Sequence, residues 1–254
     1  WLVDPLNKYS DKLIIDAKGM FLDNSNSIFR GAQNGFLGPT ALCLEPEEIE
    51  IRDTVVPVDT RKSFGLLNEI IKKRKENSSL LKTLTNKFSK VKNKYSFGGG
   101  QLGKQLTNVC NLIASDVYIP VYKVALGSFD THNNQSNTHR NLLKDLDTSL
   151  SSTINALKDI GVWKDTLIMT YSEFGRRANE NGSRGTDHGM AAPHFILGGS
   201  IEGGITGQYD DLSNLWNNNI NYKVDYRSLY EFVLRKHFNI EDNPFSKFKN
   251  SDII

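Results

Sequence analysis

Residues 117–126 read Val117-Tyr118-Ile119-Pro120-Val121-Tyr122-Lys123-Val124-Ala125-Leu126, a run whose dense apolar content is typical of a strand buried in a parallel sheet. Leucine and isoleucine then recur at steps of three and four over residues 143–157, which predicts a long helix, and Gly161 stands where such a helix ends. Residues 166–171, Thr166-Leu167-Ile168-Met169-Thr170-Tyr171, predict a second buried strand. Strand, long helix and strand in this order indicate a βαβ unit with a right-handed crossover.

The elements around this unit extend the same pattern. A helix is predicted before it, from Gln101 to Ser115. After it come a third short strand at 195–197 and a last helix that begins near Asp225, a good N-cap, and ends in Arg235-Lys236-His237. The expected fold class is therefore α/β, with a sheet flanked by helices.

The first 95 residues differ in character from the rest. Residues 1–60 are irregular, and residues 63–94 show a helical pattern rich in lysine. We therefore divide the chain into an irregular and helical region, 1–95, which is part of the same domain or an insertion, and an α/β region, 96–254, which carries the candidate metal site. The lysine-rich helix is either a patch for an anionic partner or a solvated helix face, and such charge runs favour the second interpretation.

Charge and hydropathy exclude some classes of function. The 254 residues include 31 basic and 29 acidic ones, so the formal net charge of +2 predicts no nucleic-acid partner. No apolar run approaches the roughly 20 residues that span a bilayer, so no transmembrane segment is expected. Cys43 and Cys110 could form one disulfide, but two buried thiols are the favoured interpretation.

Side chains able to carry chemistry gather where the predicted strands begin or end. In open α/β sheets, binding sites form at the carboxyl ends of parallel strands, so we expect these side chains to lie close together. The candidate site residues are Asp130, His132, Glu173, Arg176, Asp187 and His188.

The mixture of oxygen and nitrogen donors predicts a divalent metal site. Asp130 and His132 are two residues apart, so they point the same way in an extended chain. The glycine-rich loop 181–185 can bend back and bring the next two donors to the same edge. Such donors favour zinc first, with manganese or iron as alternatives, and calcium remains open if only carboxylates bind. The predicted metal ligands are Asp130, His132, Glu173, Asp187 and His188.

Arg176 is the predicted catalytic residue, because a guanidinium beside a metal suits a phosphate or sulfate oxygen. The alternative is an ion pair with a neighbouring acid such as Glu180. Each candidate taken alone could instead be a surface or turn residue. His194 stays open between a ligand, a residue that supports a ligand, and a core residue, whereas His139 and His237 are interpreted as structural.

The same residues carry a resemblance to a known family. The runs at 129–135, 172–176, 181–189 and 225–230 resemble domain-of-unknown-function family 1501. That family belongs to the alkaline phosphatase-like superfamily, beside sulfatases and phosphopentomutases.

The resemblance implies an alkaline phosphatase-like sheet and a metal-binding role for the strand-end acids and histidines. Phe174 departs from the superfamily pattern, in which many members have Ser-Asp-His where this chain has Ser-Glu-Phe. Family members generally carry a twin-arginine export signal, which implies a periplasmic or cell-surface location. Superfamily enzymes place the nucleophile in an N-terminal portion, and the opening Trp1-Leu2 looks like a mid-family segment, so we expect the chain to lack that portion.

Two functions are expected from these patterns. The first is a metal-dependent hydrolase that acts on a small anionic ester, a phosphate or a sulfate. The alternative is a non-catalytic binding or assembly subunit that keeps the fold and joins a protein partner in an exported or surface complex. A polysaccharide-binding role through Trp163, Trp216 and Tyr209 is a weaker third possibility, because buried core aromatics are the commoner interpretation.

Overall fold

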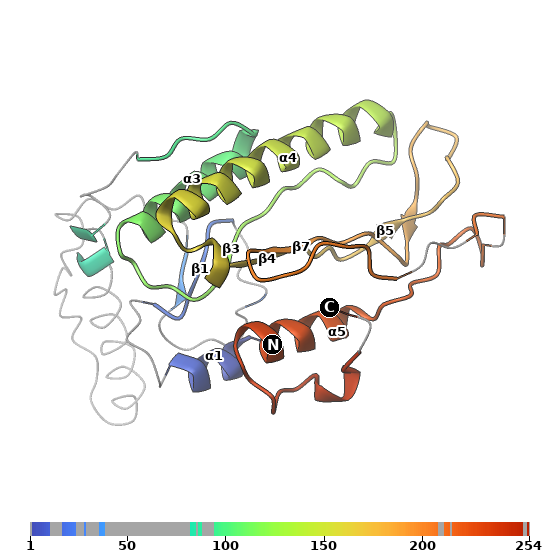
Figure 1. Ribbon diagram of the computed structural model, residues 1–254. Helices are drawn as coiled ribbons and strands as arrows, with labels where there is room; N and C mark the ends of the chain where they lie inside the picture. The colour runs from blue at the N-terminus through green and yellow to red at the C-terminus, as the bar shows by residue number, and fades with distance from the viewer. Residues whose placement is uncertain are drawn as a thin grey trace, which may run out of the picture. The chain divides into compact units, whose positions relative to one another are not determined.

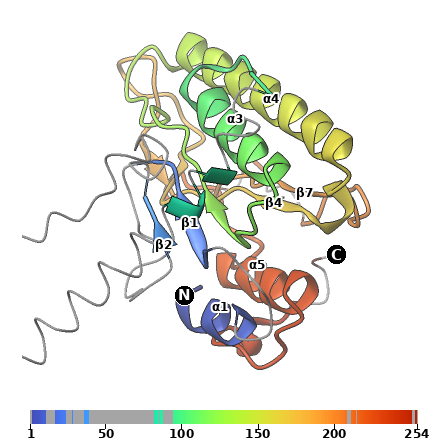
Figure 2. The same ribbon diagram turned by 90° about the vertical axis from the view of Figure 1, so that its left-hand side faces the viewer.

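The computed structural model describes residues 2–10, 17–23, 28, 36–38, 82–84, 86, 87, 94–207, 211–213, 215–250 and 253. The chain forms two compact units, Trp1–Ser96 with Gln105–Ala125, and Phe97–Lys104 with Leu126–Ile254. Helices and small sheets make up both units, so the predicted α/β class is confirmed (Figures 1 and 2).

The first unit contains a parallel three-stranded sheet. Its strands are β1 (Gly19–Phe21), β2 (Phe36–Leu37) and β3 (Tyr122–Lys123), in the order β2-β1-β3. In register, Met20 of β1 lies opposite Leu37 of β2 and Tyr122 of β3. The strand predicted over 117–126 is therefore parallel as expected, but its ladder is shorter than the apolar run.

The core of this unit is aliphatic. Helix α1 (Val3–Ser10) belongs to the unit, and helix α3 (Gly100–Ala114) enters it from Gln105 onward. The helix predicted over 101–115 is thus confirmed. Cys110 on α3 is a buried free thiol, and burial raises its pKa to about 12, as expected for a packed rather than a reactive cysteine. The buried core cluster is Ala17, Met20, Leu22, Leu37, Leu84, Val109, Leu112, Val117 and Ile119.

The second unit is built on the long helix α4 (Gln135–Ile160). Its apolar side packs inward through Ala156 and Leu157, and Gly161 ends it with φ 89°. Glycine adopts this left-handed conformation with little steric strain. The Gly161 N–H donates hydrogen bonds to the carbonyls of Leu157 and Lys158, which closes the helix end. The predicted helix and its stop are therefore confirmed.

A short antiparallel pair follows α4. The 3₁₀ turn Trp163–Asp165 leads into β4 (Leu167–Met169), which pairs with β7 (Ile196–Gly198) (Figure 1). Both strands match runs that the sequence predicts as strands. The parallel pairing predicted between the first two strands of a βαβ unit is not among the described pairs, because β3 joins β1 and β4 joins β7.

The last helix begins where the sequence predicts. α5 (Tyr226–Phe232) has Asp225 at its N-cap, where the side chain accepts a hydrogen bond from the backbone N–H of Arg227. The helix continues as the π-helix Val233–His237, so its basic end is also confirmed. A 3₁₀ turn, Ser246–Phe248, packs back on α5 through its Phe248 ring, over which Arg227 lies 3.9 Å from the centroid.

Asp225 gives a testable acid dependence of stability. The Arg227 side chain, which binds the Asp225 carboxylate, is the main cause that lowers its pKa. A lowered carboxyl pKa stabilises the fold above the ordinary value of about 4 and loses that contribution as pH falls through the lowered value. Asp225→Ala should therefore cost about 1 kcal/mol of unfolding free energy at pH 7. Urea unfolding should show this difference shrinking in acid, and a pH-independent difference would contradict the assignment.

Two sequence predictions lie outside the described residues. Cys43 is not described, and of the lysine-rich helix at 63–94 only residues 82–84, 86, 87 and 94 are. Within the described part of the chain, no helix combines the length and apolar character needed to cross a membrane.

Candidate metal centre

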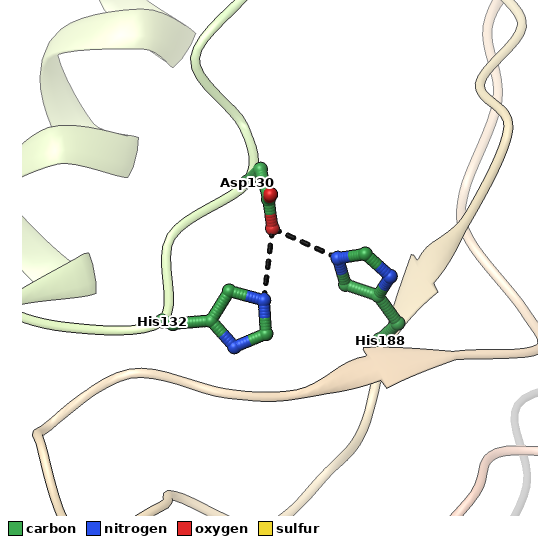
Figure 3. Close-up of side chains that lie close together, drawn as sticks. All are labelled: Asp130, His132 and His188. Carbon is green, nitrogen blue, oxygen red and sulfur yellow. Dashed lines mark hydrogen bonds and ion pairs between the residues drawn. The ribbon is translucent and has the colours of Figure 1, made fainter.

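Three of the predicted ligands converge in the second unit. Asp130 and His132 lie in the segment between β3 and α4, and His188 begins the short strand β6 (His188–Gly189). Figure 3 shows the Asp130 carboxylate between the two imidazole rings. Asp130 Oδ1 lies 3.0 Å from His132 Nε2 and 2.8 Å from His188 Nε2.

The spacing of these donor atoms fits a single cation. Each residue offers one ligand atom, and the three atoms lie within 4.8 Å of one another. Zinc–ligand distances of about 2.0–2.1 Å in a tetrahedron place neighbouring donors about 3.3 Å apart. The two oxygen–nitrogen distances are close to that value, so Asp130, His132 and His188 could hold a metal ion.

This side-chain group is open to solvent. The side chains of Asp130, His132 and His188 are 56%, 49% and 48% exposed. Closed structural zinc sites have four protein ligands, whereas a three-ligand group leaves a coordination position for water or a substrate. The arrangement is therefore of the open kind.

A β-hairpin places His188. β5 (Gly175–Arg176) pairs antiparallel with β6, so Arg176 lies directly opposite His188 and Gly175 opposite Gly189. Both glycines are required by close backbone contact. A Cβ on Gly175 would lie 1.8 Å from the Ala191 carbonyl oxygen, and one on Gly189 would lie 2.5 Å from the Arg176 carbonyl carbon.

The loop of this hairpin ties the other two ligands into position. The backbone N–H of Thr186 donates to the Thr131 carbonyl, and the Asn181 side-chain amide donates to the His132 carbonyl at 3.0 Å. At the start of α4, the N–H groups of Asn134 and Gln135 donate to the Ser183 and Arg184 carbonyls. The loop therefore serves as the cap of α4, whose Asn134 N-cap has no side-chain hydrogen bond of its own. It also fixes residues 131–135 against the hairpin, as the predicted bend of loop 181–185 requires.

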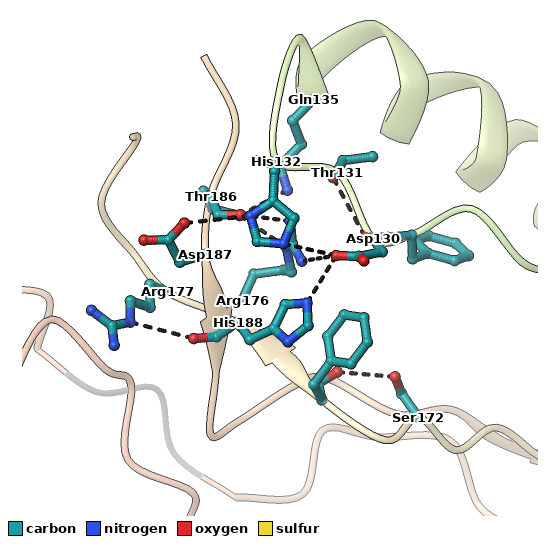
Figure 4. A network of polar contacts seen from close by, with 12 residues as sticks. Asp130, Thr131, His132, Gln135, Ser172, Arg176, Arg177, Thr186, Asp187 and His188 are labelled. Atoms are coloured by element: carbon teal, nitrogen blue, oxygen red, sulfur yellow. Dashed lines mark hydrogen bonds and ion pairs between the residues drawn. The ribbon is translucent and has the colours of Figure 1, made fainter. Parts of the chain in front are cut away.

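Arg176 is held beside Asp130 by contacts of all its nitrogen atoms. Its Nη1 donates to Asp130 Oδ1 at 3.2 Å, while Nε and Nη2 donate to the hydroxyl and carbonyl of Thr186 (Figure 4). Gln135 also donates to the Thr186 hydroxyl. The hydrogen bond with His188, followed by that with Arg176, lowers the pKa of the Asp130 carboxyl, so it is an anion ready to bind a cation.

Asp187 and Glu173 lie outside the group of three. Asp187 Oδ1 faces His132 Nδ1 at 3.4 Å, on the opposite side of the ring from Asp130. Glu173 is exposed, two positions before β5. The described metal-capable group therefore contains three of the five predicted ligands.

Phe174 has a role that its residue type does not reveal. Its ring stacks on His188, with centroids 3.9 Å apart and planes 8° from parallel. Arg176 lies 5.7 Å from the centre of the same phenyl ring. Phe174 thus packs against a metal-capable histidine and restrains the orientation of its ring.

The remaining histidines lie apart from the three-residue group. His139 on α4 contacts the Thr131 hydroxyl at 2.9 Å and packs edge-on against Phe129, which fits its structural interpretation. His237 ends the π-helix, and burial lowers its pKa. His194 is half-buried near the Thr170 hydroxyl, and burial lowers its pKa as well. Neutral imidazoles are therefore expected at His194 and His237.

Sequence reasoning missed the polar frame around the ligands. Thr186, Gln135 and Asn181 hold Arg176 and His132 through contacts between residues up to about 50 positions apart. Only Asn181 carries a local signal, because its side chain accepts from the N–H groups of Ser183 and Gly185 as asparagines at turns do.

Comparison with known protein families gives one match. Residues 99–240 match the family described as protein of unknown function (DUF1501). The chain belongs to the DUF1501 family. All residues of the three-residue group and of the hairpin fall within the matched region. Neither the curated proteins nor the solved structures contain a match to this DUF1501 chain.

Proposed function

We propose that this DUF1501 protein is a metal-dependent hydrolase of phosphate or sulfate esters with an alkaline phosphatase-like fold. The observation that carries the proposal is the open group formed by Asp130, His132 and His188, with the Arg176 guanidinium bonded to the same carboxylate. Three protein ligands beside a fixed cationic side chain suit an anionic substrate that approaches from solvent.

Zinc is the proposed cation, with manganese or iron as alternatives. Two imidazoles and one carboxylate form the donor set, and such mixed nitrogen and oxygen donors favour these metals over magnesium or calcium. When bound, the cation would polarise an ester oxygen and offset negative charge that develops on it.

The part proposed for Arg176 is to orient the anionic group of the ester. Contacts with Asp130 and Thr186 use three of the five N–H donors of a guanidinium, which leaves two for a substrate oxygen. Because these contacts already fix the side chain, little conformational entropy is lost when a substrate binds. A small anionic ester is therefore the proposed substrate class.

Phe174 supports a second candidate function. Its ring stacks on His188, and it stands in the sequence where the resemblance places a histidine in many superfamily members, so a full two-metal site is not proposed. The alternative proposal is a non-catalytic subunit of an exported or surface complex, which keeps a single cation for structure and binds a protein partner. For either function a periplasmic or cell-surface location is proposed from the family resemblance.

Metal content and ester turnover test the proposal together. The purified protein should contain one equivalent of zinc, manganese or iron by elemental analysis and should hydrolyse 4-nitrophenyl phosphate or sulfate. His188→Ala removes one of the three ligands. Loss of a residue that only hydrogen-bonds a ligand lowers metal affinity by up to about 100-fold, so loss of the ligand itself should lower it further. Turnover should fall with it.

Asp242→Ala is the control, because Asp242 is an exposed carboxylate of the same unit, outside the group of three. A folded wild-type protein that takes up no metal would remove the basis of the hydrolase proposal. Metal without turnover of either ester would favour the assembly subunit instead.

A further inference from the structure

The two nitrogen atoms of His132 face two different carboxylates. Nε2 lies 3.0 Å from Asp130 Oδ1, within the three-residue group, while Nδ1 lies 3.4 Å from Asp187 Oδ1. In Figure 4 the ring of His132 stands between Asp130 on one side and Asp187 on the other. The two carboxylates therefore face different nitrogen atoms of the same imidazole ring.

The two nitrogen atoms of an imidazole have different roles when the ring binds a metal. A neutral ring binds a cation through the nitrogen that has no proton, and it carries its single proton on the other nitrogen. A carboxylate facing that second nitrogen accepts the N–H, fixes the tautomer and makes the first nitrogen a better donor. Asp187 Oδ1 faces Nδ1 of His132 at 3.4 Å, so a small closing movement would give it this role.

The structure also holds Asp187 in that position. Its carbonyl accepts a hydrogen bond from the Arg177 N–H, in line with the β5–β6 ladder. The Asn181 side-chain amide donates to the His132 carbonyl at 3.0 Å and lies 3.5 Å from Asp187 Oδ1. One amide thus links the two residues whose side chains must stay aligned.

We propose that Asp187 is a positioning residue that orients His132 for the cation, and that it is not itself a metal ligand. This inference rests on the metal centre of the proposed function. Asp187 and His188 are neighbours in the sequence but have different roles. His188 is one of the three candidate ligands, whereas Asp187 lies behind the ring of His132.

Zinc affinity of two Asp187 variants separates a positioning role from direct ligation. An asparagine oxygen can still accept the Nδ1 proton, but a neutral amide is a poor zinc ligand. Competition of the protein with a chromophoric chelator for Zn²⁺ should therefore show about 10–100-fold weaker binding in Asp187→Ala. Asp187→Asn should recover most of that loss.

Two spectroscopic readouts report on geometry rather than on stability. Nitrogen-15 NMR of the Zn²⁺-loaded wild-type protein should show His132 protonated at Nδ1. With Co²⁺ in place of zinc, the visible spectra of the wild type and of saturated Asp187→Ala should have the same band positions, because the ligands are unchanged. Asp242→Ala and Asp242→Asn are the matched controls, at an exposed aspartate of the same unit.

Each outcome decides the inference. Loss of all binding in both Asp187 variants, or a changed Co²⁺ spectrum, would make Asp187 a direct ligand and overturn it. Asp187→Ala that binds Zn²⁺ as tightly as Asp242→Ala would overturn it as well, while the metal centre stands. A folded wild-type protein that binds no Zn²⁺ would remove the metal centre, and this inference with it.

Discussion

Asp130→Asn is expected to weaken metal binding by this DUF1501 protein severely. The two histidines and Arg176 all contact Oδ1 of this one carboxylate, which is the only anion in the group of three. Asparagine keeps the size of the side chain and removes its charge. Because the substitution changes a ligand rather than a residue that hydrogen-bonds a ligand, zinc affinity should fall by more than about 100-fold.

The charge balance around Asp130 gives the physical reason for so large an effect. A divalent cation must approach a guanidinium whose Nη1 lies 3.2 Å from the Asp130 carboxylate. With the carboxylate present, its negative charge offsets that of Arg176. Without it, the cation would meet two neutral imidazoles beside a fixed positive charge, which is repulsive at such short range.

Isothermal titration with Zn²⁺ measures this effect, and Asp242→Asn is its isosteric control. Both variants remove one negative charge from an exposed aspartate of the same unit, so they change the net charge equally. Asp242→Asn should bind zinc as the wild type does. Equal affinity in Asp130→Asn and Asp242→Asn would show that zinc binds elsewhere, and the proposed centre would have to be abandoned.

Local patterns in the sequence predict three of the described helices, but not α1 (Val3–Ser10), which lies in the region interpreted as irregular. Apolar spacing locates α3 and α4, Gly161 marks the end of α4, and Asp225 marks the start of α5. These features depend on neighbours three or four residues away, which a periodic pattern records. The family match over residues 99–240 likewise confirms the resemblance stated from the motifs.

Strand partners could not be predicted in the same way. An apolar run such as 166–171 indicates a buried strand but says nothing about its neighbour. β4 pairs with β7, nearly 30 residues later and antiparallel, so the expectation that Glu173 follows a strand parallel to β3 has no support among the described pairs. The site is instead assembled by the hairpin of β5 and β6, whose two-residue strands are too short to give an alternating pattern.

The sequence predicts that the candidate ligands lie close together, but not how they are arranged. Asp130, His132 and His188 meet because the loop of the hairpin returns to residues 131–135. The glycine-rich composition of that loop indicates that it can bend. The position it reaches depends on hydrogen bonds to residues 131–135, about 50 residues earlier in the chain. Asp187 shows the consequence, since residue type predicts a ligand and only the geometry places it behind His132.

Gly185→Ala should disrupt the metal centre, although Gly185 has no side chain and is not itself a candidate ligand. Gly185 is buried, and a Cβ there would lie 2.3 Å from the His132 carbonyl carbon and 2.6 Å from the Asn133 nitrogen. These atoms belong to the backbone, so no side chain can rotate to relieve the overlap. The loop and residues 131–135 must therefore separate.

The expected cost of this separation has two parts. Overpacking of a close contact destabilises a fold by about 1–3 kcal/mol, which urea unfolding of the metal-free protein would measure. Movement of His132 also breaks the spacing between its Nε2 and Asp130 Oδ1, so zinc affinity should fall as well. A displacement of about 1 Å is enough to spoil a site whose donors must all meet one ion.

The same loop contains its own control. A Cβ on Gly182 would meet nothing within 4 Å, and Gly182 is exposed. Gly182→Ala should therefore leave zinc affinity unchanged and hold or slightly raise stability, because alanine restricts the unfolded chain more than glycine does. If Gly185→Ala matched Gly182→Ala in both measurements, the close approach of this loop to His132 would be refuted. Loss of stability and zinc affinity in Gly185→Ala alone would show that backbone contact, and not the ligands by themselves, builds the centre.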